Sequence, residues 1–563
     1  MKRECQIARN NSGRAQLGLA ILGSIFITGC GTHTTPITVT VPPGDVVTYH
    51  NDLARTGQYP YETVLNRTNV APASFGKVAS LPVDGVVYAQ TLFAQGVVTA
   101  KGTYDLLLVE TEHDSVYAFD ATGLSKTPIW KRSFLGDGDL PCSGCTTLSV
   151  ADINAPNIYP EIGITATPVI DPSGQIIYIL AATKENGNYF QKLHALDLKT
   201  GNELPGSPVA ITATAAGGGF GANNGVLTFD PHWQLSRAGL ALSGGTLFFG
   251  FSSFDDQEGS HGWFLAYDAS TLKQLNAFVT TPNSGLGSIW GGAPAIDDAG
   301  IVYFSTANAD PNFLQTPGDY GNSVMKLSSR LQVFDYFTPY DNRALDISDI
   351  DLGSGGVLLV PDQPGSGPVV PAPLLIAGGK EGTVYVVNRD NMGHFNTDPN
   401  ANSDPQIIQE VRGIIPGDKS DGPGIYGTPS YFNNTVFTIA AGDYLRSWPI
   451  MNDQLEVSLM TKANEYIPLR GATASISSNG AANGIIWFLN ASAYTYHADG
   501  TPITNGPSIL MAYNTDDISA PLYRSDHVPA DAAGFAVKFA VPTVANGRVY
   551  VGTQTEVSVY GTH

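Results

Sequence analysis

Charged and aromatic side chains recur at turns that precede short alternating apolar stretches. The clearest turn is Glu112-His113-Asp114, which comes directly before the stretch 115–120. Carboxylate, imidazole, ammonium and aromatic groups that converge from several turns could bind a ligand or transfer a proton. Any single one could equally be a solvated turn residue, so the hypothesis depends on their convergence. The candidate ligand-binding residues are Glu112, His113, Asp114, Glu161, Lys184, Glu185, Trp290, Lys380, Glu381, Tyr426 and Arg470.

Other motifs with known chemistry are weak in this sequence. Asp346, Asp349 and Asp351 could offer hard oxygens to Ca²⁺, but the spacing of an EF-hand and its final Glu are missing, so a surface loop is expected. The Gly-rich stretch 216–225 precedes no helix and is not a phosphate loop. No nucleophile elbow is visible. We therefore assign no catalytic residue and no metal site.

The elements that must position these candidates are strands. Period-2 alternation and β-branched or aromatic runs recur, and no amphipathic segment of helix length stands out. A stretch such as 114–120 alternates, ends in Asp and is followed by a Thr-Gly or Ser-Thr turn, as it is again near 192–201 and 264–271. We expect its apolar residues to pack between sheets and its Asp to hold the turn. A supersecondary unit repeated at this spacing predicts a ring of similar sheets.

Eight inner strands rich in small residues can be assigned, at 88–91, 165–171, 239–242, 292–297, 356–360, 427–431, 472–476 and 541–545. Small side chains suit the crowded axis of a propeller. The last unit has three strands, so the strand at 75–81 is predicted to supply the fourth and close the ring. The fold class is all-β, an eight-bladed β-propeller over residues 47–563. The extra length per unit is assigned to insertions at 136–162, 213–236, 306–321, 340–355 and 395–423.

The N-terminus is predicted to be a targeting segment. Basic residues precede an apolar run at 17–27 that is too short to cross a bilayer, and Cys30 follows. This resembles the lipobox of bacterial lipoproteins, which implies a signal peptide at 1–29, lipidation of Cys30 and a Thr/Pro-rich tether at 30–46. An ordinary signal peptide with a chance Cys is the alternative. Gly31 stands where an Asp would mark inner-membrane retention, so the resemblance implies the outer membrane of a cell envelope.

Two of the four cysteines remain beyond that segment, Cys142 and Cys145. A lone CxxC could be redox-active or half of a metal site, but no second pair completes it. In an exported protein a disulfide within a loop is the expected outcome.

Composition limits the class of partner. The chain is 42% hydrophobic and 14% charged, with a formal net charge of −21. This is a globular composition, and its negative charge opposes binding to nucleic acid. We expect a soluble monomeric domain that carries a lipid anchor.

The repeated Tyr-Ala-x-Asp-x-x-Thr-Gly…Trp pattern resembles the repeat of the pyrroloquinoline-quinone propellers, the quinoprotein alcohol dehydrogenase-like superfamily. The resemblance spans roughly 75–561 and is nearest to secreted bacterial members known only by the repeat. It implies an eight-bladed ring and leaves activity open, because enzymes and non-catalytic envelope proteins share it. In the enzymes a quinone stacks between a Trp and a disulfide of adjacent cysteines, beside Ca²⁺. Trp290, Lys380 and Arg470 could serve such a cofactor, but Cys142 and Cys145 are not adjacent.

Two hypotheses follow. The first is an exported propeller that binds an envelope protein or a small molecule at the channel mouth without catalysis. The alternative is a dehydrogenase for alcohols or sugars that depends on pyrroloquinoline quinone and Ca²⁺. A hydrolase or lyase on the same scaffold is a third class.

Overall fold

A computed structural model describes residues 43–136, 142, 144–156, 158–257, 259–311, 318–363, 371–418, 422–496, 502–504 and 506–563. All of them belong to the unit Thr38–His563. The predicted signal peptide, Cys30 and most of the predicted tether lie outside the described residues, and these assignments stay predictions. No helix within the described ranges is long and apolar enough to cross a membrane.

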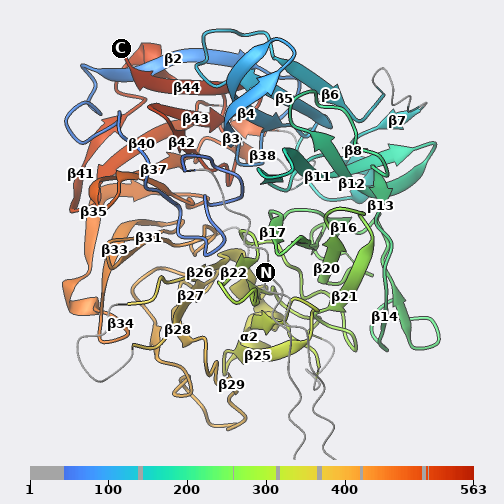
Figure 1. The fold of residues 1–563 in the computed structure, drawn as a ribbon. Coiled ribbons are helices and arrows are strands. Elements are labelled where there is room, and N and C mark those ends of the chain that lie inside the picture. Colours follow the sequence, from blue (N-terminus) through green and yellow to red (C-terminus); the bar gives the residue numbers. More distant parts are fainter. Residues whose placement is uncertain are drawn as a thin grey trace, which may run out of the picture. The chain divides into compact units, whose positions relative to one another are not determined.

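In the described part of the chain, eight antiparallel sheets follow one another around a ring, which Figure 1 shows face-on. We number them blades 1 to 8. The core strands of blades 1 to 4 are β3 (Leu92–Thr99), β4 (Gly102–Glu110), β5 (Ser115–Asp120) and β6 (Trp130–Ser133); β10 (Val169–Asp171), β11 (Ile176–Glu185), β12 (Asn188–Asp197) and β13 (Val209–Ala210); β17 (Ala241–Ser243), β18 (Thr246–Gly250), β20 (Trp263–Asp268) and β21 (Gln274–Val279); β22 (Ala295–Ile296), β23 (Val302–Ser305), β24 (Val324–Leu327) and β25 (Val333–Thr338).

The core strands of blades 5 to 8 are β26 (Val357–Leu359), β27 (Leu374–Gly378), β28 (Val384–Asn388) and β30 (Gln409–Val411); β31 (Ser430–Phe432), β32 (Thr435–Ile439), β33 (Asp443–Met451) and β35 (Thr461–Ile467); β36 (Ser475–Asn479), β37 (Ala482–Asn490), β40 (Ile509–Asn514) and β41 (Asp517–Arg524); β42 (Thr543–Ala545), β43 (Arg548–Gly552), β44 (Glu556–Thr562) and β2 (Phe75–Pro82). The predicted eight-bladed propeller is confirmed.

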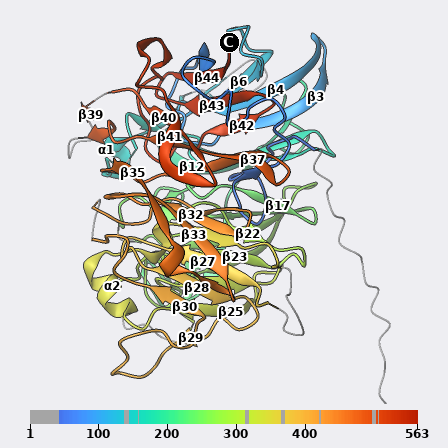
Figure 2. The same ribbon diagram turned by 90° about the vertical axis from the view of Figure 1, so that its left-hand side faces the viewer.

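Shorter elements occupy the predicted insertions and the blade edges. They are β1 (Gln58–Tyr59), β7 (Cys145–Thr146), β8 (Leu148–Ser149), β9 (Glu161–Ile162), β14 (Thr214–Ala216), β15 (Val226–Thr228), β16 (Gln234–Leu235), β19 (Ser252–Ser253), β29 (His394–Phe395), β34 (Gln454–Leu455), β38 (Thr495–Tyr496), β39 (Pro502–Thr504), α1 (Val150–Ile153), α2 (Asn342–Ser348) and the 3-10 turns Leu352–Ser354, Val457–Leu459 and Pro529–Asp531. Figure 2, an edge-on view, shows α1, α2 and β39 on the same side of the ring.

Packing between blades explains the alternation in the sequence. In β4, Leu106 and Leu108 belong to the cluster shared with blade 2, whereas Leu107 and Val109 belong to the cluster shared with blade 8. Successive side chains of a strand point to opposite faces, so each strand joins two neighbouring cores. The same division holds around the ring, and each pair of adjacent blades encloses a cluster of buried apolar side chains.

The repeated Asp residues hold turns, as the sequence predicted. Asp197 Oδ1 accepts hydrogen bonds from the backbone N–H groups of Lys199 and Thr200, and Asp268 binds its own turn in the same way. The following Gly has a packing role. A Cβ on Gly201 would lie 2.4 Å from the Trp130 ring of blade 1, so this turn accepts the Trp of the preceding blade.

Ring closure also follows the prediction. β2 pairs antiparallel with β44, from Phe75 opposite Thr562 to Pro82 opposite Glu556. This pairing supplies the fourth strand of blade 8 from the start of the fold and covers the edge that blade would otherwise expose.

Several predicted inner strands begin too early. The ladder of blade 1 starts at Leu92 and not at 88, and that of blade 2 at Val169 and not at 165. The residues just before these ladders bond to neighbouring blades instead, because they stand where blades converge. Leu240 N–H donates to Thr167 O, and Thr543 Oγ1 donates to Thr91 O.

An N-terminal segment, residues 46–59, links the blades in order. Main-chain hydrogen bonds join Val46 to Phe93 of blade 1, Val47 to Ile170 of blade 2, Leu53 to Ile296 of blade 4, Ala54 to Leu359 of blade 5, Thr56 to Tyr431 of blade 6 and Gly57 to Ile476 of blade 7. Thr48 Oγ1 donates to Leu240 O of blade 3, and Asn546 N–H of blade 8 donates to the Tyr59 hydroxyl. A segment that touches every inner strand must lie within the ring. Figure 1 shows this first part of the described chain, in blue, reaching the centre.

Candidate functional site

Residues that stand just before the inner strands enclose a cavity of about 60 Å³. Because they come from blades 1 to 4 and 6 to 8, the cavity lies at the axis of the ring. A space of this size holds a few water molecules or a small chemical group. It is lined by Tyr49, Tyr88, Thr165, Thr167, Arg237, Gly239, Trp290, Gly291, Gly292, Tyr426, Thr473 and Phe539.

The N-terminal segment contributes one wall of the axial cavity through Tyr49. The Tyr49 hydroxyl lies 3.3 Å from Thr428 Oγ1 and 3.2 Å from Thr473 Oγ1, between blades 6 and 7. Burial raises the pKa of this phenol above its ordinary value. The same segment bonds to residues at or next to the inner strands of all eight blades, so it lies inside the ring.

One cation, Arg237, lines the axial cavity and lies against two aromatic rings. The Arg237 guanidinium carbon lies 4.6 Å from the Trp290 ring centre and 4.9 Å from that of Phe539. The Tyr426 ring lies 6.4 Å from Trp290 and 6.0 Å from Phe539. Cation–π attraction of this kind is worth about 0.5–2 kcal/mol per ring, depending on burial. The contacts with both rings help to hold the guanidinium in place.

Further basic groups lie near these aromatic rings. Lys538 Nζ lies 5.8 Å from the Phe539 ring and 6.0 Å from that of Tyr494. The Tyr494 hydroxyl lies 2.8 Å from that of Tyr88, and the nearby positive charges of Arg470 and Arg237 act against the rise in the Tyr494 pKa that burial causes. Three cations thus meet around two tyrosines, in a chain whose net charge is −21.

The predicted residues Glu112, His113, Asp114 and Glu161 also come together. The first three form the turn between β4 and β5, and Glu161 lies on β9 of the insertion before blade 2. His113 Nδ1 lies 3.0 Å from Glu161 Oε1, and Thr147 Oγ1 donates to Glu161 Oε2 at 2.7 Å. Burial raises the pKa of Glu112 to about 8, although the nearby Arg237 charge acts against this. Burial, then the charges of Glu112 and Glu161, hold the pKa of Asp114 well above its ordinary value.

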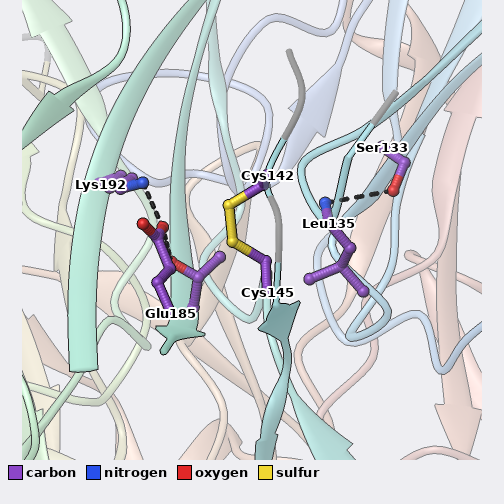
Figure 3. The surroundings of a disulfide bond; sticks show 7 residues. Ser133, Leu135, Cys142, Cys145, Glu185 and Lys192 are labelled. Carbon is purple, nitrogen blue, oxygen red and sulfur yellow. Dashed lines mark hydrogen bonds and ion pairs between the residues drawn. A yellow bond between two sulfur atoms is a disulfide. The ribbon is translucent and has the colours of Figure 1, made fainter. Parts of the chain in front are cut away.

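Lys184 and Glu185 form a different group at the tip of the β11–β12 hairpin. Lys184 pairs with Asp152 of α1, and Glu185 pairs with Lys192. Glu185 stands opposite Cys145 in the sheet. Figure 3 shows that the Cys142–Cys145 disulfide lies beside this Glu185–Lys192 pair. These residues tie the insertion to blade 2 and do not line the axial cavity.

The Cys142, Cys145 and Glu185 side chains lie close enough for a metal ion. The two sulfurs, however, are joined in a disulfide, so neither offers a thiolate. This group therefore gives no metal site in its oxidised form.

Lys380 and Glu381 are occupied by other protein groups. Lys380 Nζ lies 2.7 Å from Asp351 Oδ2 and 3.2 Å from Asp349 Oδ1. Glu381 pairs with Arg412 and accepts a hydrogen bond from the Tyr385 hydroxyl at 3.0 Å. Both side chains connect loops between blades, and neither lines the axial cavity.

The surface-loop interpretation of Asp346 and Asp351 is wrong. Both are buried, and Asp346 Oδ1 accepts hydrogen bonds from Ala309 N–H and Asn322 Nδ2. Asp351 Oδ1 accepts one from Asn308 N–H. Both carboxylates accept hydrogen bonds from the main chain of blade 4, and Lys380 pairs with Asp351. The spacing of the three Asp residues in the sequence does not reveal these partners.

Of the eleven candidate residues, Trp290 and Tyr426 line the axial cavity. Arg470 lies near Tyr494, whose hydroxyl contacts that of the lining residue Tyr88. Sequence reasoning missed Arg237, Phe539, Tyr88 and Tyr49. A signal exists for two of them: like Trp290 before 292, Arg237 and Phe539 stand two positions before the predicted starts of inner strands, at 239 and 541. Their convergence depends on the ring itself.

The residues around Trp290 do not fit a stacked quinone. One neighbour of its ring is the Arg237 guanidinium at 4.6 Å, where a cofactor would stack. The cavity of about 60 Å³ is several-fold smaller than the roughly 300 Å³ at which ligand pockets begin. The disulfide lies in the β7–β11 region and not against Trp290. No step of a quinone reaction can be derived from this arrangement.

Comparisons with known proteins identify the fold. No protein-family profile matches the chain, and no curated protein matches its sequence. Solved structures do match. The quinohemoprotein alcohol dehydrogenase ADHIIG from Pseudomonas putida HK5 is 14% identical, with a TM-score of 0.61 over 94% of this chain and 83% of that one. The quinohemoprotein alcohol dehydrogenase from Comamonas testosteroni is 13% identical, with a TM-score of 0.59 over 92% and 80%.

A europium-containing methanol dehydrogenase is 12% identical, with a TM-score of 0.54 over 92% of this chain and 98% of that one. At such identities the likeness concerns the fold, and it agrees with the repeat seen in the sequence. The chain therefore has the eight-bladed propeller fold of the quinoprotein alcohol dehydrogenases.

Proposed function

We propose that this chain is an exported, lipid-anchored β-propeller of the bacterial cell envelope that binds a protein partner or a small ligand at its axial cavity, without catalysis. The observation that carries the proposal is the Arg237 guanidinium packed against Trp290 and Phe539 in the axial cavity. Fixed aromatic and charged groups in a concave site are typical of recognition.

The size and charge of the axial cavity describe what it would accept. A volume of about 60 Å³ admits one small group, such as a carboxylate on a side chain or on a small molecule. Arg237 would bind that group, Arg470 and Lys538 would add positive charge near it, and the aromatic rings would contact the atoms that carry it. A guanidinium suits carboxylate because it can donate two parallel hydrogen bonds.

Two kinds of experiment test the binding proposal. A photo-activatable phenylalanine analogue at position 426 should cross-link a specific envelope partner in cells, and the same analogue at the exposed position 124 should not. Purified protein should bind benzoate or inorganic phosphate, detected by the change in tryptophan fluorescence. Arg237→Gln should weaken that binding at least tenfold, whereas the exposed-site variant Arg330→Gln should leave it unchanged.

Two sets of results would contradict binding at the axial cavity without catalysis. Equal cross-linking from positions 426 and 124, together with unaltered binding in Arg237→Gln, would remove the axial cavity as the site. The dehydrogenase alternative requires that added pyrroloquinoline quinone and Ca²⁺ support dye-linked oxidation of alcohols or sugars. Turnover that is lost in Trp290→Ala would establish that alternative and overturn the non-catalytic proposal.

The anchor is tested separately. Cys30→Ser should abolish labelling by a radioactive fatty acid and release the protein from the membrane fraction. Labelling that persists in Cys30→Ser would refute lipidation at that residue.

A further inference from the structure

The turn between β4 and β5 buries carboxylate oxygens that find no hydrogen-bond partner within the described residues. Glu112 and Asp114 are each 0% exposed. Glu112 Oε1 and both Oδ1 and Oδ2 of Asp114 lack a partner. A buried polar group without a partner costs about 1–3 kcal/mol, and more if it is charged. Such a concentration in three residues calls for a specific explanation.

Both side chains are held in place by their surroundings. Glu112 Oε2 accepts hydrogen bonds from Gly163 N–H at 2.8 Å and from Thr165 Oγ1 at 3.0 Å. Asp114 has a backbone φ of 50°, a left-handed conformation that is uncommon outside Gly, Asn and Asp. Its N–H donates to Thr111 O, and its carbonyl accepts from Phe134 N–H. The free oxygens are thus fixed in position before any ligand arrives.

Gly163 brings these oxygens together. A Cβ at this residue would lie 2.4 Å from the main-chain oxygen of Glu112 and 2.7 Å from Asp114 Oδ1. Both oxygens therefore face the same side of Gly163, and only a residue without a side chain fits there. This close approach fixes a main-chain oxygen and a carboxylate oxygen of blade 1 beside the same residue of blade 2.

The charges around the turn are mainly negative. The negative charges of Glu112, Glu161 and Asp84 act on Asp114, and the positive charge of Lys192 opposes them. Lys192 is itself paired with Glu185. Arg237 acts on Glu112, and His113 pairs with Glu161. Two buried carboxyls can exist here only as protonated acids or with a bound cation.

We propose that Glu112 and Asp114 bind a divalent cation that prefers oxygen ligands, with Ca²⁺ as the best candidate. Its protein ligands would be Glu112 Oε1, the Asp114 carboxylate and the main-chain oxygen of Glu112, and water would complete the shell. Ca²⁺ accepts six to eight oxygen ligands, including carbonyl groups and water, so few side chains are needed. The ion would link the β4–β5 turn of blade 1 to the chain around Gly163 of blade 2.

The test uses the full mature chain after treatment with a chelator at pH 8. Wild-type protein should bind added CaCl₂ in isothermal titration calorimetry and show a higher melting temperature with Ca²⁺ than without. Asp114→Asn and Glu112→Gln should each weaken Ca²⁺ binding at least tenfold and lose the thermal shift. Glu110→Gln is the matched control, because Glu110 is also buried and its two carboxylate oxygens have no partner among the described residues, but it lies on β4 and outside the 112–114 turn. It should bind Ca²⁺ like the wild type.

Two results would overturn the proposal. One is the absence of both a heat of binding and a thermal shift in the wild type with CaCl₂ or MgCl₂, which would leave protonated carboxyls as the explanation. The other is unchanged Ca²⁺ affinity in Asp114→Asn. Near-ultraviolet circular dichroism of the metal-free variants distinguishes a lost site from a lost fold. If Asp114→Asn does not fold, Gly163→Ala, which crowds the same oxygens, provides the second variant and should also weaken binding.

Discussion

At the scale of single residues, burial decides what a carboxylate does. Asp197 and Asp268 are half-buried at strand ends, where they hold turns through short hydrogen bonds to the backbone. Glu110 lies on β4 in the same repeat unit as the Glu112 turn, yet it is fully buried and neither of its carboxylate oxygens has a partner in the described residues. The sequence shows acidic residues in both places, and only their surroundings in the fold distinguish the turn-forming carboxylates from the buried one.

Glu110 should make stability depend on pH. Burial raises its pKa in the folded protein to about 8, from an ordinary value of 4.5. As the pH rises from 4.5 to 8, the unfolded chain loses this proton while the folded chain keeps it, so the free energy of unfolding falls. The loss is on the order of 4 kcal/mol by pH 8. Glu110→Gln should remove this part of the pH dependence, measured by urea unfolding at pH 5 and pH 8. An unchanged difference between the two pH values in the variant would show that Glu110 is not the group responsible.

At the scale of elements, the segment 46–59 has the least expected role. Its only strand is the two-residue β1, which pairs in parallel with β36 of blade 7, yet the segment bonds in turn to residues at or next to the inner strands of the ring. Arg55 is its fully buried cation: Nε and Nη2 donate to Pro294 O at 3.0 and 2.7 Å, and Nη1 donates to Asp52 O at 3.0 Å. The sequence analysis included this segment in the propeller from residue 47 on, but a segment without repeat or alternation gives no indication of where it lies.

Arg55→Met should destabilise the whole ring. The change leaves the buried oxygens of Pro294 and Asp52 without these donors, and the expected loss in the free energy of unfolding is about 3 kcal/mol or more. Urea unfolding followed by tryptophan fluorescence measures it. Arg330→Met, at an exposed turn of blade 4, should cost less than about 0.5 kcal/mol. If both variants unfold at the same urea concentration, the segment is not a structural link between blades.

At the scale of the whole propeller domain, the ring is closed by the pairing of an early strand, β2, with the last strand, β44. Phe75 at the start of β2 is fully buried, with its ring centre 5.4 Å from that of Trp487 and 4.9 Å from that of Tyr523. These rings belong to blade 7, and β2 itself pairs with β44 of blade 8. One residue therefore contributes both to ring closure and to the core between the last two blades.

Phe75→Ala should cost about 3–5 kcal/mol, because it removes a large ring from a packed core and weakens the closing strand. Val78→Ala on the same strand should cost less than about 1 kcal/mol, since Val78 is 38% exposed. Differential scanning calorimetry of both variants measures the difference. Equal melting temperatures would show that the closing strand adds little to stability.

Local patterns determined the architecture. Alternation with period 2, Asp-ended strands and small residues at the inner positions follow from contacts within one blade or between neighbours, so they recur and can be counted along the sequence. The closing strand at 75–81 was predictable for the same reason, because the last unit is one strand short. The starts of the inner strands were missed by a few residues where those residues bond across to other blades.

The candidate site was decided by the tertiary structure. Arg237, Trp290 and Phe539 come from blades 3, 4 and 8, and their contact requires the ring to be closed. In the same way, the ion pairs of Lys380 and Glu381 engage groups from other loops, so the sequence cannot separate them from residues that face a ligand. The Glu112-His113-Asp114 turn was singled out from the sequence by its charges. The structure adds that two of these three are buried against Gly163, which no neighbouring residue in the sequence could show.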